Sequence, residues 1–127
     1  KEVKRLTKGE GVPVVYDAVG QSTWEGSLDC LQRLGTMVTF GNASGPVAPI
    51  SPALLAAKGS IFLTRPTLMS YNVTRAELTK SANALFKVVQ SGAVKIEINQ
   101  TYKLKDAAKA HRDLEGRKTT GSTIFTV

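Results

Sequence analysis

Residues 12–41, VPVVYDAVGQSTWEGSLDCLQRLGTMVTFG, carry the clearest structural signal in the chain. Residues 12–20 form a nearly unbroken apolar stretch rich in β-branched side chains, which is typical of a strand covered on both faces in a parallel sheet. Residues 36–41 have a similar apolar composition, and the apolar residues of the segment between the two runs follow helical spacing. Parallel strands need a crossover between them, and such crossovers are right-handed. The pattern therefore predicts a strand, helix, strand unit.

The intervening segment, residues 21–35, has the marks of a helix. Ser22 and Glu25 have the spacing of a capping box, in which each side chain bonds a free backbone N–H at the helix start. Gly35 stands where a helix commonly ends, because glycine readily adopts the left-handed backbone of a C-cap. Three apolar residues follow helical spacing, namely Trp24, Leu28 and Leu31. We therefore expect a helix that turns this apolar face to the sheet.

The alternation of helices and strands continues along the chain. A proline at the first helical position and a closing glycine frame a short helix at residues 51–59, and residues 60–65 form a third strand. Thr74 and Glu77 make a second capping box, which opens the longest helix. The remaining expected elements are a strand at 94–98, a helix at 106–116 and a strand at 122–127. The order predicts an α/β fold, and the change to alternating strands near residue 93 predicts a separate second sheet.

The composition excludes several classes of protein. Of the 127 residues, 42% are hydrophobic and 21% are charged, and no apolar segment is long enough to cross a bilayer. The net charge of +7 suggests an anionic partner, but few aromatics lie among the scattered basic residues, which argues against a nucleic-acid surface. With one cysteine and one histidine, the chain forms no internal disulfide and no complete zinc site. The N-terminus has no secretory pattern, so we expect a cytoplasmic protein.

The candidate site lies at the ends of the predicted strands, because ligands of open parallel sheets bind outside the carboxyl ends. Those ends are residues 17–20, 40–45 and 64–68, and small residues dominate the middle one. Two interpretations stay open: the glycines only form turns, or they let backbone groups lie against a ligand. Arg65 and Arg117 are candidate phosphate partners, although a solvated surface role is more frequent for an arginine. A glycine-rich phosphate loop is absent, and no residue has the surroundings of a general acid or base.

Three stretches of the chain resemble one known family. They are VVYDAVGQSTWEGSLDCLQRLGTMVTFGNASGP, KGSIFLTRPTL and LKDAAKAHRDLEGRKTTGS. Their order and spacing resemble the C-terminal part of bacterial NADPH:quinone oxidoreductases, in the zinc-free branch of the medium-chain dehydrogenase/reductase superfamily related to zeta-crystallin. The resemblance implies that residues 1–92 are the C-terminal half of a Rossmann-type parallel sheet with flanking helices, without its glycine-rich loop. Residues 93–127 would return to a GroES-like catalytic domain, and the chain would be a C-terminal fragment.

The resemblance also implies a cofactor site. Family members bind NADPH, and the residues that match their cofactor contacts are Ala18, Phe40, Gly41, Asn42, Ala43, Pro66, Thr67, Leu68 and Arg117. Residues 40–43 would line the ribose and nicotinamide side, and residues 66–68 would meet the carboxamide region with backbone groups. Arg117 would pair with a phosphate. The ending GSTIFTV departs from the family pattern at Ser122, which removes support for a phosphate role there.

By the same resemblance, the parent enzyme would transfer reducing equivalents from NADPH to a quinone. We expect no catalytic residue and no metal ligand in the chain. The isolated chain should be inactive, because the glycine-rich loop and the catalytic domain are both missing. The strand Ser60–Arg65 matches the edge through which family members pair, which implies a homodimer. Two alternatives stay open: another reductase of the superfamily, such as an enoyl reductase, and a non-catalytic dimerisation or RNA-binding module.

Overall fold

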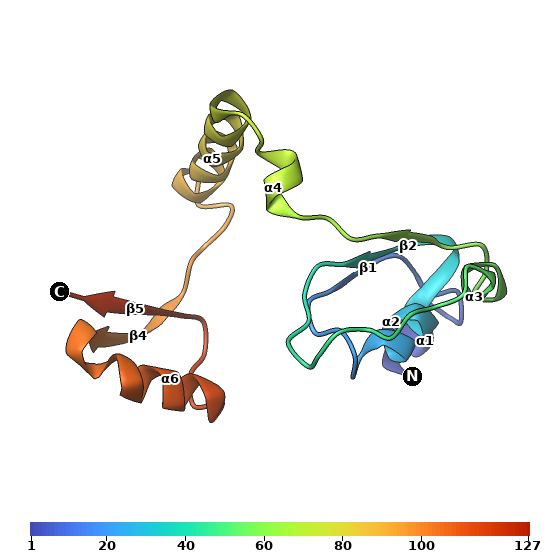
Figure 1. The fold of residues 1–127 in the computed structure, drawn as a ribbon, viewed down its shortest axis with the longest axis horizontal. Helices are drawn as coiled ribbons and strands as arrows, with labels where there is room; N and C mark the ends of the chain where they lie inside the picture. The colour runs from blue at the N-terminus through green and yellow to red at the C-terminus, as the bar shows by residue number, and fades with distance from the viewer. The chain divides into compact units, whose positions relative to one another are not determined.

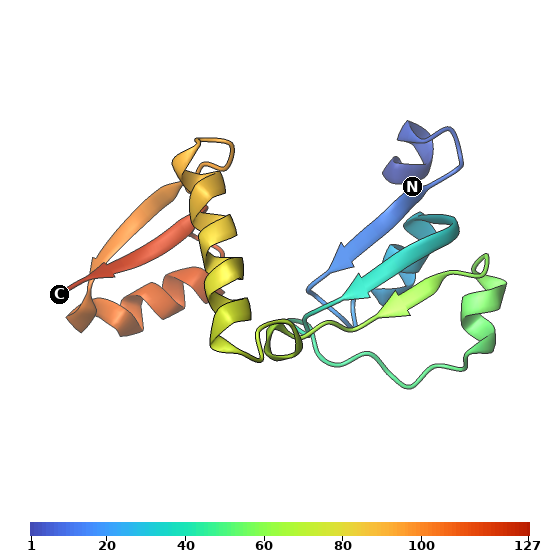
Figure 2. The same cartoon turned by 90° about the horizontal axis from the view of Figure 1, so that it is seen from above.

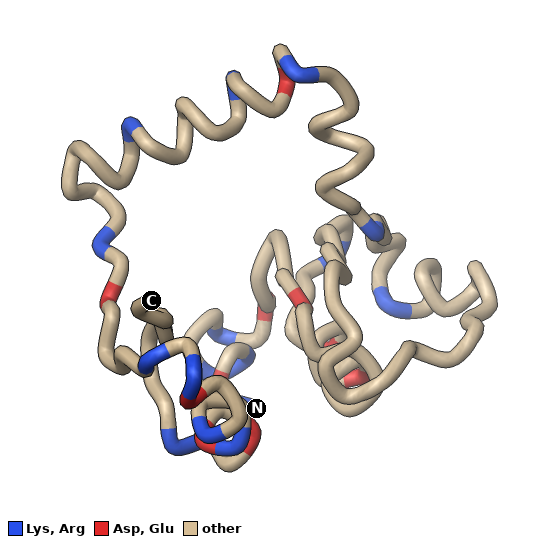
Figure 3. The backbone as a smooth tube through the Cα atoms, turned by 60° about the vertical axis from the view of Figure 1, so that its left-hand side comes forward, with Lys and Arg blue, Asp and Glu red and all other residues tan.

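The computed structural model describes residues 1–127, which form two compact units, Lys1–Val73 and Thr74–Val127 (Figure 1). The division falls before the longest helix, whereas the domain boundary expected from the sequence follows that helix at residues 92–93. The assignment of those domains within a parent enzyme stays a prediction. In both units Lys and Arg are interspersed with Asp and Glu along the backbone (Figure 3). All helices are too short or too polar to traverse a lipid bilayer.

The first unit is built on a parallel three-stranded sheet with the order β1-β2-β3. The strands are β1 (Val12–Asp17), β2 (Leu31–Thr39) and β3 (Phe62–Thr64), and their arrows run in one direction in Figure 2. The helices of this unit are α1 (Glu2–Leu6), α2 (Trp24–Cys30), α3 (Ala53–Ala57) and α4 (Leu68–Tyr71). The parallel strands with helical crossovers confirm the predicted α/β fold.

The core of this unit lies on one face of its sheet. The buried side chains are those of Trp24, Leu28, Leu31, Met37 and Ile61, and the partly buried Leu54 and Leu55 of α3 pack against them. On the opposite face, Val14, Tyr16 and Phe62 remain 39%, 73% and 61% exposed. The expectation that β1 is covered on both faces is therefore wrong for this chain. Both crossover helices, α2 and α3, contribute to the same core, so they leave the second face bare.

The helix α2 is shorter than predicted. It begins after Thr23, which makes no side-chain capping bond, so the capping box predicted for Ser22 and Glu25 is wrong. The backbone N–H of Ser22 instead donates to Oγ of Ser44 (3.0 Å), outside the helix. Gly35 does not end the helix either, because β2 already starts at Leu31. The apolar spacing is confirmed, since Trp24, Leu28 and Leu31 are all buried.

The second unit contains a two-stranded parallel sheet and two α-helices. Strands β4 (Ile98–Lys103) and β5 (Ser122–Thr126) form a sheet separate from the first, as predicted. The helices are α5 (Arg75–Gln90) and α6 (Ala107–Glu115), with the short 3-10 helix η1 (Leu104–Asp106) before α6. The second capping box is confirmed. Thr74 accepts a hydrogen bond from the N–H of Glu77 (3.2 Å), whose carboxylate accepts from the N–H of Thr74 (2.8 Å).

The strand expected at residues 94–98 is misplaced. β4 begins only at Ile98, which is paired with Ser122 of β5. Residues 94–97 lie outside any strand, and their one backbone bond to β5 is at the end, where the N–H of Ser122 donates to the carbonyl of Glu97 (2.7 Å). An alternating pattern does not make a strand unless a neighbour bonds its backbone groups, and here the pairing starts later.

Candidate functional site

The three strands of the first unit end at one edge of the sheet. Asp17 of β1 is in register with Thr39 of β2, and Val38 of β2 is in register with Thr64 of β3. Beyond the last pair, the N–H of Phe40 donates to the carbonyl of Asp17 (2.9 Å). The segments that follow β1, β2 and β3 therefore leave the sheet side by side. This juxtaposition is the one predicted from the order of the elements.

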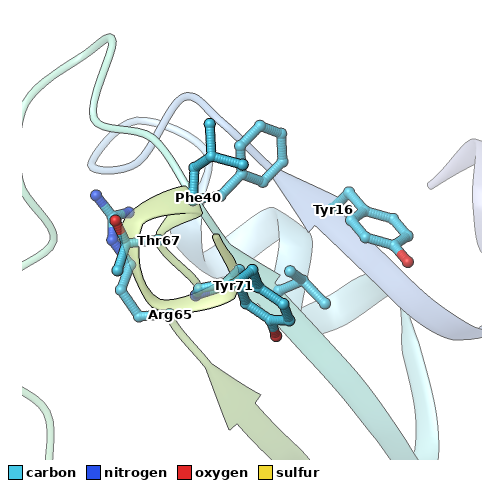
Figure 4. A pocket seen from close by; sticks show the side chains of 8 residues that line it. Tyr16, Phe40, Arg65, Thr67 and Tyr71 are labelled. Atoms are coloured by element: carbon cyan, nitrogen blue, oxygen red, sulfur yellow. The ribbon is translucent and has the colours of Figure 1, made fainter. Parts of the chain in front are cut away.

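An open cavity of about 710 Å³ lies at this edge, on the bare face of the sheet (Figure 4). It is lined by Tyr16, Val38, Phe40, Arg65, Pro66, Thr67, Leu68 and Tyr71. The rings of Tyr16, Phe40 and Tyr71 border the hollow from β1, from the end of β2 and from α4 (Figure 4). The lining is mainly apolar and aromatic, with a guanidinium and hydroxyl groups as polar contacts. Such a lining suits a planar ring with a polar substituent.

The small residues after β2 bring two loops into backbone contact. A Cβ placed on Gly41 would lie 2.2 Å from the carbonyl oxygen of Ala18 and 2.8 Å from its Cα. A Cβ placed on Gly20 would lie 2.6 Å from the carbonyl oxygen of Gly45, and Gly20 has a φ of +89° that other residues rarely adopt. The glycines are therefore required by the packing of the loop 18–20 against the loop 41–45, before any ligand is considered.

Hydrogen bonds across the two loops fix this packing. The N–H of Ala43 donates to the carbonyl of Ala18 (3.3 Å), and the N–H of Ser44 donates to the carbonyl of Val19 (2.8 Å). The hydroxyl of Ser44 donates to the same carbonyl of Val19 (2.8 Å). In the other direction, the N–H of Gln21 donates to the carbonyl of Gly45 (3.0 Å). The loop after β2 is therefore held by the loop after β1.

A buried carboxylate organises the first of these loops. Asp17 is only 4% exposed, and its Oδ1 accepts hydrogen bonds from the N–H groups of Val19 (2.7 Å) and Gly20 (3.0 Å). Its Oδ2 accepts from the hydroxyls of Thr23 and Ser27, both at 2.7 Å. Burial alone would raise the pKa of Asp17, but these bonds to the charged form outweigh it and lower the pKa to about 2. The carboxylate is therefore ionised at neutral pH.

The sequence prediction misses the role of Asp17, although a signal for it exists. Asp side chains commonly bond the N–H groups two and three residues further on, so an aspartate directly before a small-residue turn is a candidate for this geometry. The two hydroxyl donors, Thr23 and Ser27, could not be assigned to it without the position of α2.

Arg65 lies at the end of β3 and reaches the end of β2. One guanidinium nitrogen, Nη1, donates to the carbonyl of Gly41 (3.2 Å) and contacts Oγ1 of Thr39 (3.4 Å). The loop 41–45 is thus bonded from both sides, by the loop 18–20 and by Arg65. Arg65 also lines the cavity, so its positive charge stands beside the hollow.

The predicted cofactor residues fall into three groups. Phe40, Pro66, Thr67 and Leu68 line the cavity. Ala18, Gly41 and Ala43 belong to the loop contact, and Asn42 lines a neighbouring hollow of about 320 Å³. Arg117 lies in the second unit, after α6, where it is exposed and has a φ of +55°. The structure therefore assembles all the predicted residues except Arg117 at one edge of the first unit. Tyr16 and Tyr71 were not predicted as lining residues.

A parallel α/β architecture with an open cavity at the carboxyl edge is common among nucleotide-binding domains. A family model described as "Zinc-binding dehydrogenase" matches residues 1–124, and the chain belongs to this family. No three His, Cys, Asp or Glu side chains of the chain cluster as metal ligands. The expectation of a medium-chain dehydrogenase/reductase is confirmed.

The chain is similar to several proteins named as oxidoreductases or reductases. A quinone oxidoreductase of Salmonella typhimurium is 53% identical over 98% of this chain, which spans 39% of that protein. The solved structure of an Escherichia coli quinone oxidoreductase complexed with NADPH is 49% identical, with a TM-score of 0.90 over 99% of this chain and 39% of that one. A 2-haloacrylate reductase of a Burkholderia species is 40% identical over 97% of this chain and 37% of its own length. The chain thus corresponds to about two fifths of each relative.

Proposed function

We propose that this chain forms the nicotinamide side of the NADPH site in a quinone oxidoreductase. The observation that carries the proposal is the cavity at the carboxyl edge of three parallel strands, lined by Phe40 and by residues 66–68. These are positions at which the family resemblance implies cofactor contacts. The NADPH-bound relative with a TM-score of 0.90 supports the same use of this fold.

The residues at the edge would bind and orient the cofactor. NADPH supplies a hydride when it is bound, and the protein contributes position and electrostatics. The apolar side chains of Phe40 and Leu68 would exclude water from one face of a planar ring. The guanidinium of Arg65 is anchored through Nη1, which leaves its other nitrogens free to donate to a polar ligand. Holding two reactants in contact is the catalytic contribution we assign to this edge.

The remainder of the active site would come from outside this chain. Because the chain spans 39% of its quinone oxidoreductase relatives, we propose that it is inactive alone and works within a parent enzyme, in the cytoplasm. In that parent, residues 1–92 would belong to the cofactor domain and residues 93–127 to the segment returning to the catalytic domain. Arg117 would pair with a cofactor phosphate.

We also propose a homodimer through the edge segment Ser60–Arg65, which contains β3. β3 is the last strand of its sheet, so one side of its backbone has no strand partner. Phe62 and Leu63 on it are 61% and 37% exposed. An exposed apolar edge invites strand pairing, and a second copy would provide it in a symmetric way.

A chimera tests the proposed function. The matching segment of the Salmonella relative is replaced by this chain, and NADPH oxidation is followed with a simple benzoquinone. We expect activity in the chimera and none in the isolated chain. Leu68→Asp in the chimera places a carboxylate at the cavity and should raise the KM for NADPH about tenfold. The matched control is Leu6→Asp, since Leu6 and Leu68 are 66% and 68% exposed. A soluble, folded chimera without NADPH oxidation would contradict the proposal.

A second candidate substrate is an activated double bond, as the enoyl reductase alternative implies. The observation that favours it is the 40% identity to a 2-haloacrylate reductase. Substrate profiling of the protein that contains this chain separates the two. A kcat/KM for a haloacrylate or an enoyl ester that exceeds the value for quinones would favour this candidate.

A further inference from the structure

We propose that Asp17 is a positioning residue that sets the cofactor-side loop 41–45 through the turn 18–20. The inference rests on the proposed cofactor role of that loop. Asp17 is 4% exposed and makes no hydrogen bond to the loop itself through its side chain. Its influence has to pass through the backbone of the turn that it bonds.

The first step of this path is the turn. Oδ1 of Asp17 holds the N–H groups of Val19 and Gly20, at 2.7 Å and 3.0 Å. The carbonyl of Val19 then has a set direction, because it lies in the same planar peptide unit as the N–H of Gly20. Gly20 adopts its positive φ of +89° within the same turn.

The second step is the contact from the turn to the loop. The carbonyl of Val19 accepts two hydrogen bonds from Ser44, one from its N–H and one from its hydroxyl, both at 2.8 Å. The preceding carbonyl, that of Ala18, accepts from the N–H of Ala43. Gly41 packs on the backbone of Ala18 so closely that no Cβ fits between them. A displaced turn would therefore displace the loop.

The other half of the carboxylate fixes Asp17 to α2. Oδ2 accepts from the hydroxyls of Thr23 and Ser27, which precede and belong to that helix. The helix itself is seated in the core by Trp24 and Leu28. Asp17 thus transmits the position of a rigid, packed element to a loop that has no regular structure of its own.

The test uses substitutions that separate positioning from stability. Asp17→Ala removes both halves of the interaction. Asp17→Asn keeps an oxygen for the two N–H groups, and its amide can donate to the hydroxyls, which also accept. Ile61→Val is the control, because Ile61 is a core residue of the same unit, 5% exposed, outside the hydrogen-bond path. All three are made in the chimera and compared well below their unfolding temperatures.

Two readouts decide the inference. In Asp17→Ala we expect KM for NADPH to rise roughly three- to tenfold, as for the loss of one or two hydrogen bonds that position the site, with a smaller change in kcat. Without any ligand, amide exchange at Ala43 and Ser44 should accelerate. Asp17→Asn should restore both values to near wild type, and Ile61→Val should change neither.

The inference is overturned if Asp17→Ala shows the same KM and the same exchange at Ala43 and Ser44 as Ile61→Val. It is also overturned if Asp17→Asn behaves like Asp17→Ala. The amide-exchange measurement needs no cofactor, so it still tests whether Asp17 positions the loop 41–45 when the chimera fails to bind NADPH. In that case the proposed function is contradicted, while the effect of Asp17 on the loop is tested by the amide exchange alone.

Discussion

Replacing Gly41 by alanine is the sharpest test of the loop packing. The new Cβ would lie 2.2 Å from the carbonyl oxygen of Ala18, whereas a carbon and an oxygen in contact are normally about 3.3 Å apart. The loops would have to separate by about 1 Å. This strains the bond from Ala43 to Ala18, already long at 3.3 Å, and the bond from Phe40 to Asp17 at 2.9 Å. Overpacking costs about 1–3 kcal/mol and each weakened bond costs up to about 1 kcal/mol, so we expect a loss of about 3 kcal/mol.

Gly26→Ala is the matched control. Gly26 lies inside α2, has no positive φ, and a Cβ added to it would have no heavy atom within 4 Å. An alanine there should stabilise the helix by about 0.5–1 kcal/mol. The same chemical change at two positions is therefore expected to have opposite signs.

The single tryptophan makes the assay specific to the first unit. Trp24 is 7% exposed in the core, so its fluorescence in a urea titration reports unfolding of that core. With a slope of about 1.5 kcal/mol/M, the midpoint for Gly41→Ala should fall by about 2 M. An unchanged midpoint, or an equal loss in Gly26→Ala, would refute the reasoning from loop contact.

Three further predictions follow from single interactions. Folding lowers the pKa of Asp17 from 3.8 to about 2, so its carboxylate contributes roughly 2 kcal/mol to the free energy of unfolding above pH 3.8, and this contribution is lost as the pH drops through 2. An acid titration followed by Trp24 fluorescence should show this loss of stability, and in Asp17→Asn the stability should depend less on pH. Thr74→Ala removes the capping box of α5 and should cost about 1 kcal/mol, seen by circular dichroism as lost helix, while Thr74→Ser should retain the cap. Arg117→Gly should be more stable than Arg117→Ala by about 1 kcal/mol in thermal unfolding, since only glycine adopts the φ of +55° without strain; equal melting temperatures would contradict this.

The sequence predicts best those features that depend on neighbouring residues. The capping box of Thr74 and Glu77 forms because both partners lie within one turn of the helix start. The apolar spacing predicted for this segment is likewise confirmed, because Trp24 and Leu28 of α2 and Leu31 at the start of β2 belong to the same core. The order of strands and helices then determines the parallel sheet and brings the three strand ends together.

The wrong predictions depend on partners that are distant in the sequence. Ser22 and Glu25 have the same spacing as the confirmed box, but the N–H of Ser22 bonds Ser44 and the helix start is organised by Asp17. The strand expected at 94–98 fails because its pairing partner, β5, begins opposite Ile98. A local pattern contains no information on either of these distant competitors.

The site is predictable only in part for the same reason. Phe40 and the segment 66–68 follow strand ends, so the order of elements suffices to place them at the edge. The apolar run predicts Tyr16 as a buried strand residue, and it lines the cavity only because the second face of the sheet is bare. This face is uncovered because α2 and α3 both pack on the other face, and their packing depends on the whole unit rather than on a local pattern.

The contact between Gly41 and Ala18 changes which residues support a cofactor role. Small size at Gly41 and Gly20 is fully explained by the close approach of two loops, so it gives no independent support for a ligand. Support has to come from residues whose side chains face the open cavity, and Phe40, half exposed there, is not required by the loop packing. A substitution at Gly41 should therefore impair folding first and cofactor binding as a consequence. A substitution at Phe40 should impair binding while the fold persists, and this difference in order separates the two interpretations of the loop.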